Sequence, residues 1–274
     1  MHDLSPELYE VKFGRHGLGY KIVRLFERLT FRAAHLSIAT NESYREIAIS
    51  RGEMKPEQVL VVQTGADLCE VNGTQPESKL KRGKRHLVVF VGCMEIQDGV
   101  RLLIESIQYL VKQRGRGDAQ FVLIGPGSQV PQLKTLARQL HVENSVEFTG
   151  LLAHERVNSY LATADICVAP DPLNALNDRS TMIKHLEYMA FGKPVVLYDL
   201  KEGRSTLGNG ALYARPNDPI DFADKIEALL ESESLRKTLG EHGRKRVEEQ
   251  LNWRVQSAKF VDAFARLLSD DSRI

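Results

Sequence analysis

The sequence has too few cysteines for a disulfide framework and no excess of charge of either sign. Its three cysteines, Cys69, Cys93 and Cys167, are far apart, so neither a paired redox motif nor a cysteine-based metal site is expected. We expect reduced thiols in the cytoplasm. The chain has 37 Lys and Arg against 36 Asp and Glu, a formal net charge of +1. No global charge therefore attracts nucleic acid, and no nucleic-acid partner is expected.

Long apolar runs are also missing. The first ten residues, MHDLSPELYE, lack the apolar core of a signal peptide, and no segment resembles a membrane-spanning helix of roughly 20 apolar residues. The sequence has instead the composition of a soluble globular protein, with 42% hydrophobic and 27% charged residues. Its 274 residues suffice for one large or two ordinary domains.

From residue 84 onward, two kinds of apolar segment alternate. Amphipathic segments predict helices, as where apolar residues recur at helical spacing over 100–111. Short apolar runs predict buried parallel strands at 86–92, 120–125, 146–150, 165–170 and 193–200. Alternating strands and helices require parallel pairing through right-handed crossovers. We therefore predict an α/β fold with a doubly wound parallel sheet, whose ligands bind beyond the carboxyl ends of the strands.

The N-terminal part is too short for a second complete domain. Strands are predicted at 35–40 and 58–65 with a helix between them, which is about the last third of another doubly wound domain. We predict four parts: a partial domain at 1–65, a polar linker at 66–83, the complete domain at 84–252, and a C-terminal helix within 253–274 that packs back on the N-terminal part.

The segment 170–191 follows the strand predicted at 165–170 and carries the main candidate site. Asn177, Asp178 and Ser180 are typical N-cap residues, so a helix is predicted to begin there. The N-terminus of a helix presents unpaired N–H groups and partial positive charge, which suit a phosphate.

On such a helix Ser180, Lys184 and Glu187 would share one face. The ammonium could offset phosphate charge, and the carboxylate could accept hydrogen bonds from ribose hydroxyls. The alternative is a solvated face with a Lys–Glu pair of little energetic weight. The position at the end of a central strand favours the ligand site.

The segment 171–200, DPLNALNDRSTMIKHLEYMAFGKPVVLYDL, resembles a motif of family-four retaining glycosyltransferases. It is most similar to their bacterial surface-polysaccharide branch, which has the two-domain B-type fold. The segments VGCMEIQDGVRLLI, FVLIGPG and FTGLLAHERVNSYLATADICVAPDP also resemble that family in order and spacing. Residues 1–65 would then be the end of the acceptor-side domain, and the chain an N-terminally truncated member.

The resemblance implies transfer of a sugar, with retention, from a UDP- or GDP-sugar to a sugar or lipid-linked acceptor, with no cofactor and no metal. Lys184 and Asp178 would be the catalytic groups that stabilise the diphosphate, and Glu187 would bind the ribose. The resemblance also implies that further residues line the donor site: Gly92, Gly125, Gly127, Leu151, Leu152, Asn177, Ser180 and Thr181.

The sequence departs from the broader family pattern at charged positions. Cys93 or Met94 stands where an Arg is common, and Asp98 stands where a Lys is common. The first of two family glutamates falls on Arg179. The branch pattern implies that Asp178 and Lys184 replace the missing groups.

Three alternatives stay open: a non-catalytic sugar-nucleotide-binding fragment, half of a split enzyme with a separately encoded N-terminal half, and a nucleotide-sugar epimerase. An epimerase needs acid/base groups in the cleft, but His154 and His185 have no evident partner and are interpreted as structural. Residues 203–205 could equally form a plain turn or contact the donor.

One predicted helix is basic and amphipathic. Lys21, Arg24, Arg28 and Arg32 recur at helical spacing with apolar residues between them. We interpret it as an ordinary packing helix with a solvated basic face. The alternative is peripheral contact with the inner face of a membrane.

Overall fold

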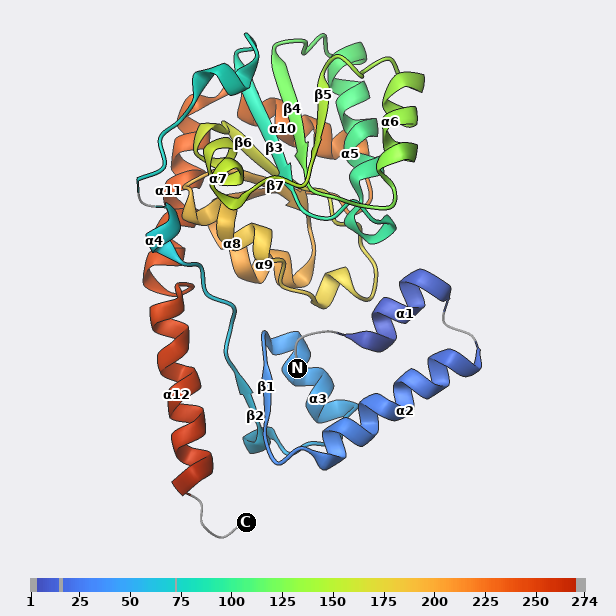
Figure 1. Cartoon of the computed structure of the whole chain (residues 1–274), viewed down its shortest axis with the longest axis vertical. Helices are drawn as coiled ribbons and strands as arrows, with labels where there is room; N and C mark the ends of the chain where they lie inside the picture. Colours follow the sequence, from blue (N-terminus) through green and yellow to red (C-terminus); the bar gives the residue numbers. More distant parts are fainter. Residues whose placement is uncertain (1–3, 15–16, 72, 270–274) are drawn as a thin grey trace.

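The computed structural model describes residues 4–14, 17–71 and 73–269. Its larger part is a parallel sheet with helices on both faces, and a smaller part lies beyond the end of that sheet (Figure 1). None of the described helices combines the length and the apolar character needed to cross a membrane.

The large sheet has six strands in the order β5-β4-β3-β6-β7-β8, all paired in parallel. The strands are β3 (His86–Val91), β4 (Ala119–Ile124), β5 (Val146–Gly150), β6 (Ile166–Ala169), β7 (Val195–Tyr198) and β8 (Ala211–Ala214). Five of them confirm the predicted strands. The sixth, β8, was not predicted because it has only four residues and two of them are alanines. The strand order reverses between β3 and β6, which makes this the topological switch point.

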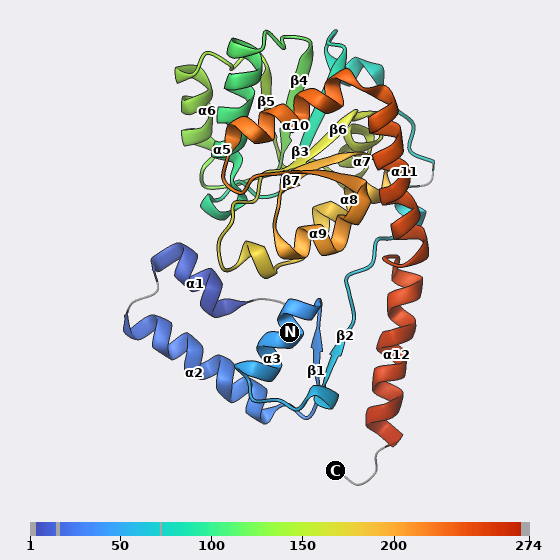
Figure 2. The same ribbon diagram turned by 180° about the vertical axis from the view of Figure 1, so that it is seen from behind.

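Helices cover both faces of the sheet (Figures 1 and 2). Their bounds are α5 (Val100–Gln108, continued by a π turn to Gln113), α6 (Val130–Gln139), α7 (His154–Thr163), α8 (Ile183–Ala190), α9 (Lys201–Leu207), α10 (Pro219–Glu231) and α11 (Glu233–Glu249). Successive strand side chains point to opposite faces. Val88 and Phe90 therefore join one core with α5, α6 and α10, whereas Leu87 and Val89 join the other with α7, α8 and α11.

The smaller part contains α1 (Ser5–Phe13), α2 (Leu18–Ala33), β1 (Ser37–Ala39), α3 (Glu42–Ser50) and β2 (Val59–Val61). β1 and β2 pair in parallel, so both predicted strands and the helix between them are confirmed, although each strand is shorter than expected. The side chain of Asn41 caps α3 by accepting a hydrogen bond from the backbone N–H of Tyr44 at 2.8 Å. Leu4, Phe31 and Tyr44 form a separate small core with α3 and the two strands.

The chain crosses between the two parts twice. The segment 66–83 contains a short helix, α4 (Leu68–Val71), and a 3-10 turn at Ser78–Lys81. The C-terminal helix α12 (Trp253–Ser269) then runs beside β2 (Figures 1 and 2). Two contacts attach its start to the first crossing: the Trp253 N–H donates to the carbonyl of Ala66 at 3.1 Å, and the Gln63 N–H donates to Gln256 Oε1 at 3.1 Å.

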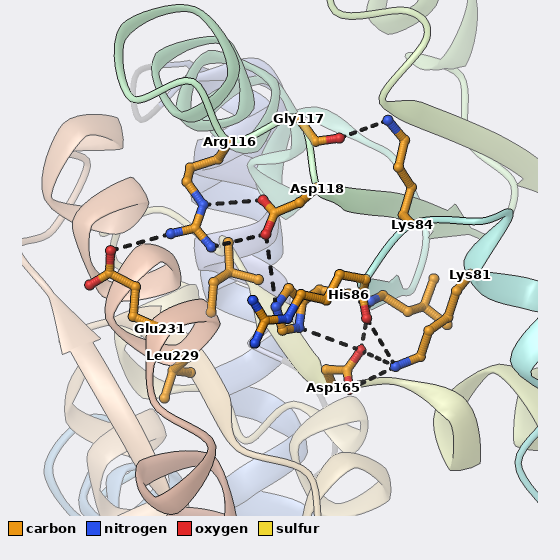
Figure 3. Close-up of polar contacts among 12 residues, drawn as sticks. Lys81, Lys84, His86, Arg116, Gly117, Asp118, Asp165, Leu229 and Glu231 are labelled. Carbon is orange, nitrogen blue, oxygen red and sulfur yellow. Dashed lines mark hydrogen bonds and ion pairs between the residues drawn. The ribbon is translucent and has the colours of Figure 1, made fainter.

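A polar cluster surrounds His86 at the start of β3, the end of the sheet opposite the switch-point loops (Figure 3). The imidazole is buried, with Nδ1 4.0 Å from Asp165 Oδ2 and Nε2 3.9 Å from Asp118 Oδ2. Asp165 pairs with Lys81 at 2.7 Å, and Asp118 pairs with Arg116 at 3.2 Å. Burial outweighs the attraction of the two carboxylates and lowers the pKa of His86 below its ordinary value of 6.5.

This lowered pKa predicts that His86 makes the fold less stable in mild acid. The unfolded chain protonates His86 near its ordinary pKa, whereas the folded chain does so only at lower pH. Stability from this residue is complete above about pH 6.5 and is lost as the pH falls toward the folded pKa. Urea unfolding of His86→Gln should show a weaker decline between pH 7 and 5 than wild type. His35→Gln, at an exposed position, is the control. An unchanged slope for His86→Gln would contradict the assignment.

Candidate functional site

Helix α8 begins later than expected. Asn177–Arg179 form a 3-10 turn, Ser180 and Met182 have extended backbone, and α8 starts at Ile183. The prediction that a helix begins at residues 177–180 is therefore wrong, and Ser180 does not share a helical face with Lys184. Met182 stands at the N-cap, and its side chain makes no hydrogen bond to the first N–H groups of α8.

The predicted capping residues bond to the surrounding loops instead. The buried Asn177 donates through Nδ2 to the carbonyl oxygens of Gln97 at 2.8 Å and Pro172 at 2.9 Å. Asp178 Oδ1 accepts a hydrogen bond from the N–H of Lys201 at 2.9 Å, at the start of α9. Side chains of this type readily bond to nearby backbone outside helices, and these two hold the loop between β6 and α8 in place.

Ser180 and Thr181 link the two parts of the molecule. The Ser180 hydroxyl lies 3.0 Å from the Tyr44 hydroxyl, and Thr181 Oγ1 accepts a hydrogen bond from Asn41 Nδ2 at 3.1 Å. Asn41 also donates to the carbonyl oxygen of Arg179 at 2.9 Å. The start of α3 therefore faces the segment that leads into α8.

Lys184 reaches into the switch point between β3 and β6. Its side chain is buried, and Nζ donates to Asp171 Oδ1 at 2.7 Å. The ammonium also lies 5.0 Å from the ring centre of Phe90, the next-to-last residue of β3, which is cation–π geometry. Sequence periodicity predicted neither contact. The one available signal for Asp171 was its place just after the carboxyl end of a buried strand.

A cavity of about 200 Å³ lies between the two parts, beside the start of α8. Three predicted donor-site residues, Asn177, Ser180 and Thr181, line it together. The other lining residues are Leu4, Leu8, Thr40, Tyr44, Thr64, Gln97, Asp98, Leu176, Met182 and Ile183. Residues from α1, α3, the β3–α5 loop and the β6–α8 segment thus meet at one cleft.

Glu187 lines a second cavity, of about 120 Å³, further along α8. His154 at the start of α7 lines it too, and Ile183 lines both cavities. Gly65 and the linker residues Ala66, Asp67 and Val71 line the second cavity as well. Leu151 and Leu152 line neither cavity: the Leu151 side chain is 79% exposed, and Leu152 is half-buried. The structure therefore does not bring these two predicted donor-site side chains together with the others.

The three glycines predicted at the donor site lie where the β3 and β4 loops pack together. A Cβ on Gly125 would clash with the carbonyl oxygen of Gly92, and a Cβ on Gly127 would clash with that of Met94. Gly125 also has φ +134°, which side chains rarely adopt. A Cβ on Gly92 would lie 3.8 Å from the ammonium of Lys184, so this turn borders the switch point.

Two titratable groups near Lys184 are shifted by their surroundings. Burial raises the pKa of Asp98, and the nearby Lys184 ammonium opposes that shift. Burial lowers the pKa of His185 to about 4. Neither ring nitrogen of His185 has a hydrogen-bond partner among the described residues. His185 lies with Asp171 and Tyr198 around another small cavity, which shares Asn177, Ser180 and Met182 with the interdomain cleft.

Two weaker candidates are also placed. Within 203–205, Arg204 forms an ion pair with Asp199 at 2.6 Å. On α2, Arg28 and Arg32 both pair with Glu53, while Ile22, Leu25, Phe26 and Leu29 stay 42–64% exposed. This exposure differs from the interpretation of α2 as an ordinary packing helix, because packing would bury its apolar side chains.

The larger part is a doubly wound domain with a cleft at its switch point, and the smaller α/β part forms the other side of that cleft. This architecture defines a class of α/β proteins that bind ligands. Residues 85–232, more than half of the chain, match the family model described as "Glycosyl transferases group 1". The chain belongs to this family.

The known relatives are longer than this chain. It is 29% identical over 160 residues to an alpha-D-kanosaminyltransferase of Streptomyces kanamyceticus, covering 58% of this chain and 40% of the relative. It is 22% identical over 259 residues to the capsular polysaccharide biosynthesis glycosyltransferase CapM of Staphylococcus aureus, covering 87% of this chain and 63% of CapM. The chain thus spans between two fifths and two thirds of these relatives.

Solved structures share the fold. The sucrose-phosphate synthase of Thermosynechococcus elongatus matches with a TM-score of 0.80 at 19% identity, over 98% of this chain and 67% of that one. Anabaena HepE, solved in complex with UDP and glucose, matches with a TM-score of 0.74 at 18% identity, over 89% and 67% of the two chains. At this identity the likeness shows the two-part fold alone.

Proposed function

We propose that this glycosyltransferase binds the nucleoside diphosphate of a UDP- or GDP-sugar across the start of α8 and transfers the sugar with retention. The observation that carries the proposal is the start of α8. The N-cap residue Met182 provides no side-chain cap, and this helix terminus lies at the interdomain cleft beside a buried ammonium. Helix N-termini of this kind bind phosphate groups. The complex of HepE with UDP and glucose supports the donor class.

In this proposal the chain stabilises the leaving diphosphate. Negative charge develops on its oxygens as the bond to the sugar breaks. The N–H groups at the start of α8 and the Lys184 ammonium are fixed donors for that charge, and fixed donors need no reorganisation during the reaction. Ser180 and Thr181 place their hydroxyls at the cleft. Glu187, on the next cavity along α8, accepts hydrogen bonds from the ribose. Asp178 acts indirectly, by holding the loop against α9.

We also propose a biological setting. The likeness to CapM supports a role in polysaccharide or glycoconjugate synthesis on a sugar or lipid-linked acceptor. The exposed apolar side chains of α2, with Lys21 and Arg24 on the same helix, support peripheral contact of a cytoplasmic protein with a membrane surface.

A second candidate function is sugar-nucleotide binding without turnover, or with turnover only beside a separately encoded N-terminal half. This candidate concerns the chain as given, which spans 40% of the kanosaminyltransferase and 63% of CapM. Acceptor contacts in such a protein would come from the other half.

Calorimetric titration with UDP-, GDP-, ADP- and dTDP-sugars tests the proposal. We expect either the UDP-sugar or the GDP-sugar to bind with 1:1 stoichiometry. The other nucleotide-sugars should bind at least about 10-fold more weakly, because their bases form roughly one or two fewer hydrogen bonds with the protein. Product analysis with the bound donor distinguishes the two candidates: sugar transfer supports the enzyme, whereas binding without turnover supports the second candidate. If none of the four donor classes binds, both candidates are wrong.

A further inference from the structure

The interdomain cavity has a single charged residue among the described residues that line it, namely Asp98. Asp98 ends the 3-10 turn Ile96–Asp98 in the loop between β3 and α5. The loop is fixed on both sides of it. Asn177 Nδ2 donates to the carbonyl oxygen of Gln97 at 2.8 Å, and Gly99, with φ +67°, packs so closely on Pro170 that a Cβ would clash with its carbonyl. The carboxyl group is therefore held at the cleft wall.

One oxygen of the Asp98 carboxyl group is hydrogen-bonded within the loop. Oδ2 accepts a hydrogen bond from the N–H of Glu95 at 3.0 Å. No hydrogen bond to Oδ1 is found in the described part of the chain. Burial raises the pKa of Asp98, the ammonium of Lys184 lowers it, and the carboxylates of Asp171 and Glu95 raise it again. The half-buried Asp98 thus brings an oxygen acceptor to the lining of the cleft, near the proposed diphosphate cation.

The chemistry of this oxygen selects among possible ligands. A carboxylate repels diphosphate, so Asp98 is unsuited to the phosphate groups themselves. The described residues contain no group of three His, Cys, Asp or Glu arranged to hold a metal ion. A nucleotide-sugar brings hydroxyl and base N–H donors to this cleft, and a carboxylate near the diphosphate cation is a strong acceptor for the hydroxyls of the attached sugar.

We propose that Asp98 binds the donor sugar, with Oδ1 accepting hydrogen bonds from hydroxyls of a hexose whose diphosphate lies at the start of α8. The inference rests on the proposed function, because it requires a nucleotide-sugar in this cleft. It assigns the three parts of the donor to different groups: the ribose to Glu187, the diphosphate to Lys184 and the helix terminus, and the transferred sugar to Asp98.

The test compares a nucleotide-sugar with the same nucleotide lacking its sugar. Calorimetry on the full chain would measure UDP-glucose against UDP, and GDP-mannose against GDP, for wild type and Asp98→Asn. We expect Asp98→Asn to weaken the nucleotide-sugar that binds by about 10-fold, since a charge-assisted hydrogen bond becomes a neutral one. Affinity for the matching nucleotide should stay within about 2-fold, because that ligand has no sugar to contact Asp98.

The controls separate a sugar contact from a structural effect. Asparagine can still accept the hydrogen bond from Glu95, so an unchanged melting temperature is expected for Asp98→Asn. Glu95→Gln alters a carboxylate on the same loop that bonds to Ser128 and does not line the cleft cavity. It should leave both affinities unchanged.

Each possible result of these titrations either supports or overturns the contact between Asp98 and the sugar. A selective loss of nucleotide-sugar affinity supports the sugar contact. An equal loss for nucleotide and nucleotide-sugar, or no loss for either, overturns it while leaving the proposed function intact. If wild type binds none of the four ligands, the proposed function fails first and this inference fails with it.

Discussion

Replacing Lys184 with methionine is expected to lower the free energy of unfolding by about 3–5 kcal/mol, because it would leave the Asp171 carboxylate buried without its counter-ion. Asp171 is 3% exposed, and its second oxygen has no hydrogen-bond partner among the described residues. The ion pair therefore neutralises a charge that the interior cannot solvate. Methionine retains the length and apolar stem of lysine, so the loss reflects mainly the missing ammonium.

A double-mutant cycle isolates the pair. Urea unfolding would be measured for Lys184→Met, Asp171→Asn and the double variant. We expect the double variant to be more stable than the sum of the single losses predicts, by at least about 1 kcal/mol, since neither residue is then left charged and alone. Lys201→Met is the matched control, because Lys201 pairs with Glu46 at 2.9 Å at a half-exposed site. Its loss should stay below about 1 kcal/mol. Equal losses of unfolding free energy for Lys184→Met and Lys201→Met would show that the buried ion pair stabilises the fold no more than an exposed one.

Replacing Glu187 with alanine is expected to weaken binding of the donor nucleotide by roughly 100-fold. Two hydrogen bonds from ribose hydroxyls to a carboxylate would be lost, each worth about 1.5–3 kcal/mol before compensation by water. Glu187→Gln should lie between wild type and alanine, since an amide can accept one of the two bonds. Calorimetric titration with the nucleotide diphosphate that wild type binds best provides the measurement.

Glu155→Ala is the control for this experiment. Glu155 is an exposed carboxylate in the first turn of α7, next to His154, which lines the same cavity as Glu187. Its removal tests whether a general loss of negative charge near the cavity alters affinity. Donor binding that is equally weakened in both variants, or unchanged in Glu187→Ala, would contradict the ribose contact.

The start of α8 shows where local sequence and tertiary structure diverge. Asn177, Asp178 and Ser180 have the chemistry of N-caps, and local propensity alone puts a helix start among them. In the fold, Asn177 bonds to the β3–α5 loop, Asp178 to the start of α9, and Ser180 meets Tyr44 of α3. Along the chain, Lys201 is 23 residues from Asp178, Gln97 is 80 residues from Asn177, and Tyr44 is 136 residues from Ser180. No local sequence pattern therefore reveals these contacts.

The helical spacing of Lys184 and Glu187 predicted that both lie near a ligand, but it did not predict which residues surround Lys184. Periodicity gives the direction of a side chain around its own helix and contains no information about the neighbouring strands. The partner of Lys184 is Asp171, which is placed by the end of β6, and its cation–π contact is Phe90 in β3. Asp98 similarly joins the cleft only because β3 and β6 are neighbours at the switch point.

The amino-acid sequence by itself determined the alternation of five strands with helices, the parallel sheet and the smaller α/β part before it, because apolar runs and helical spacing are local properties of the chain. Only the tertiary structure decided that Lys184 is buried against Asp171, that Ser180 and Thr181 join the two parts, and that Asp98 places a carboxyl group at the cleft. These features depend on burial and on hydrogen bonds between distant segments, and both exist only after the strands have paired.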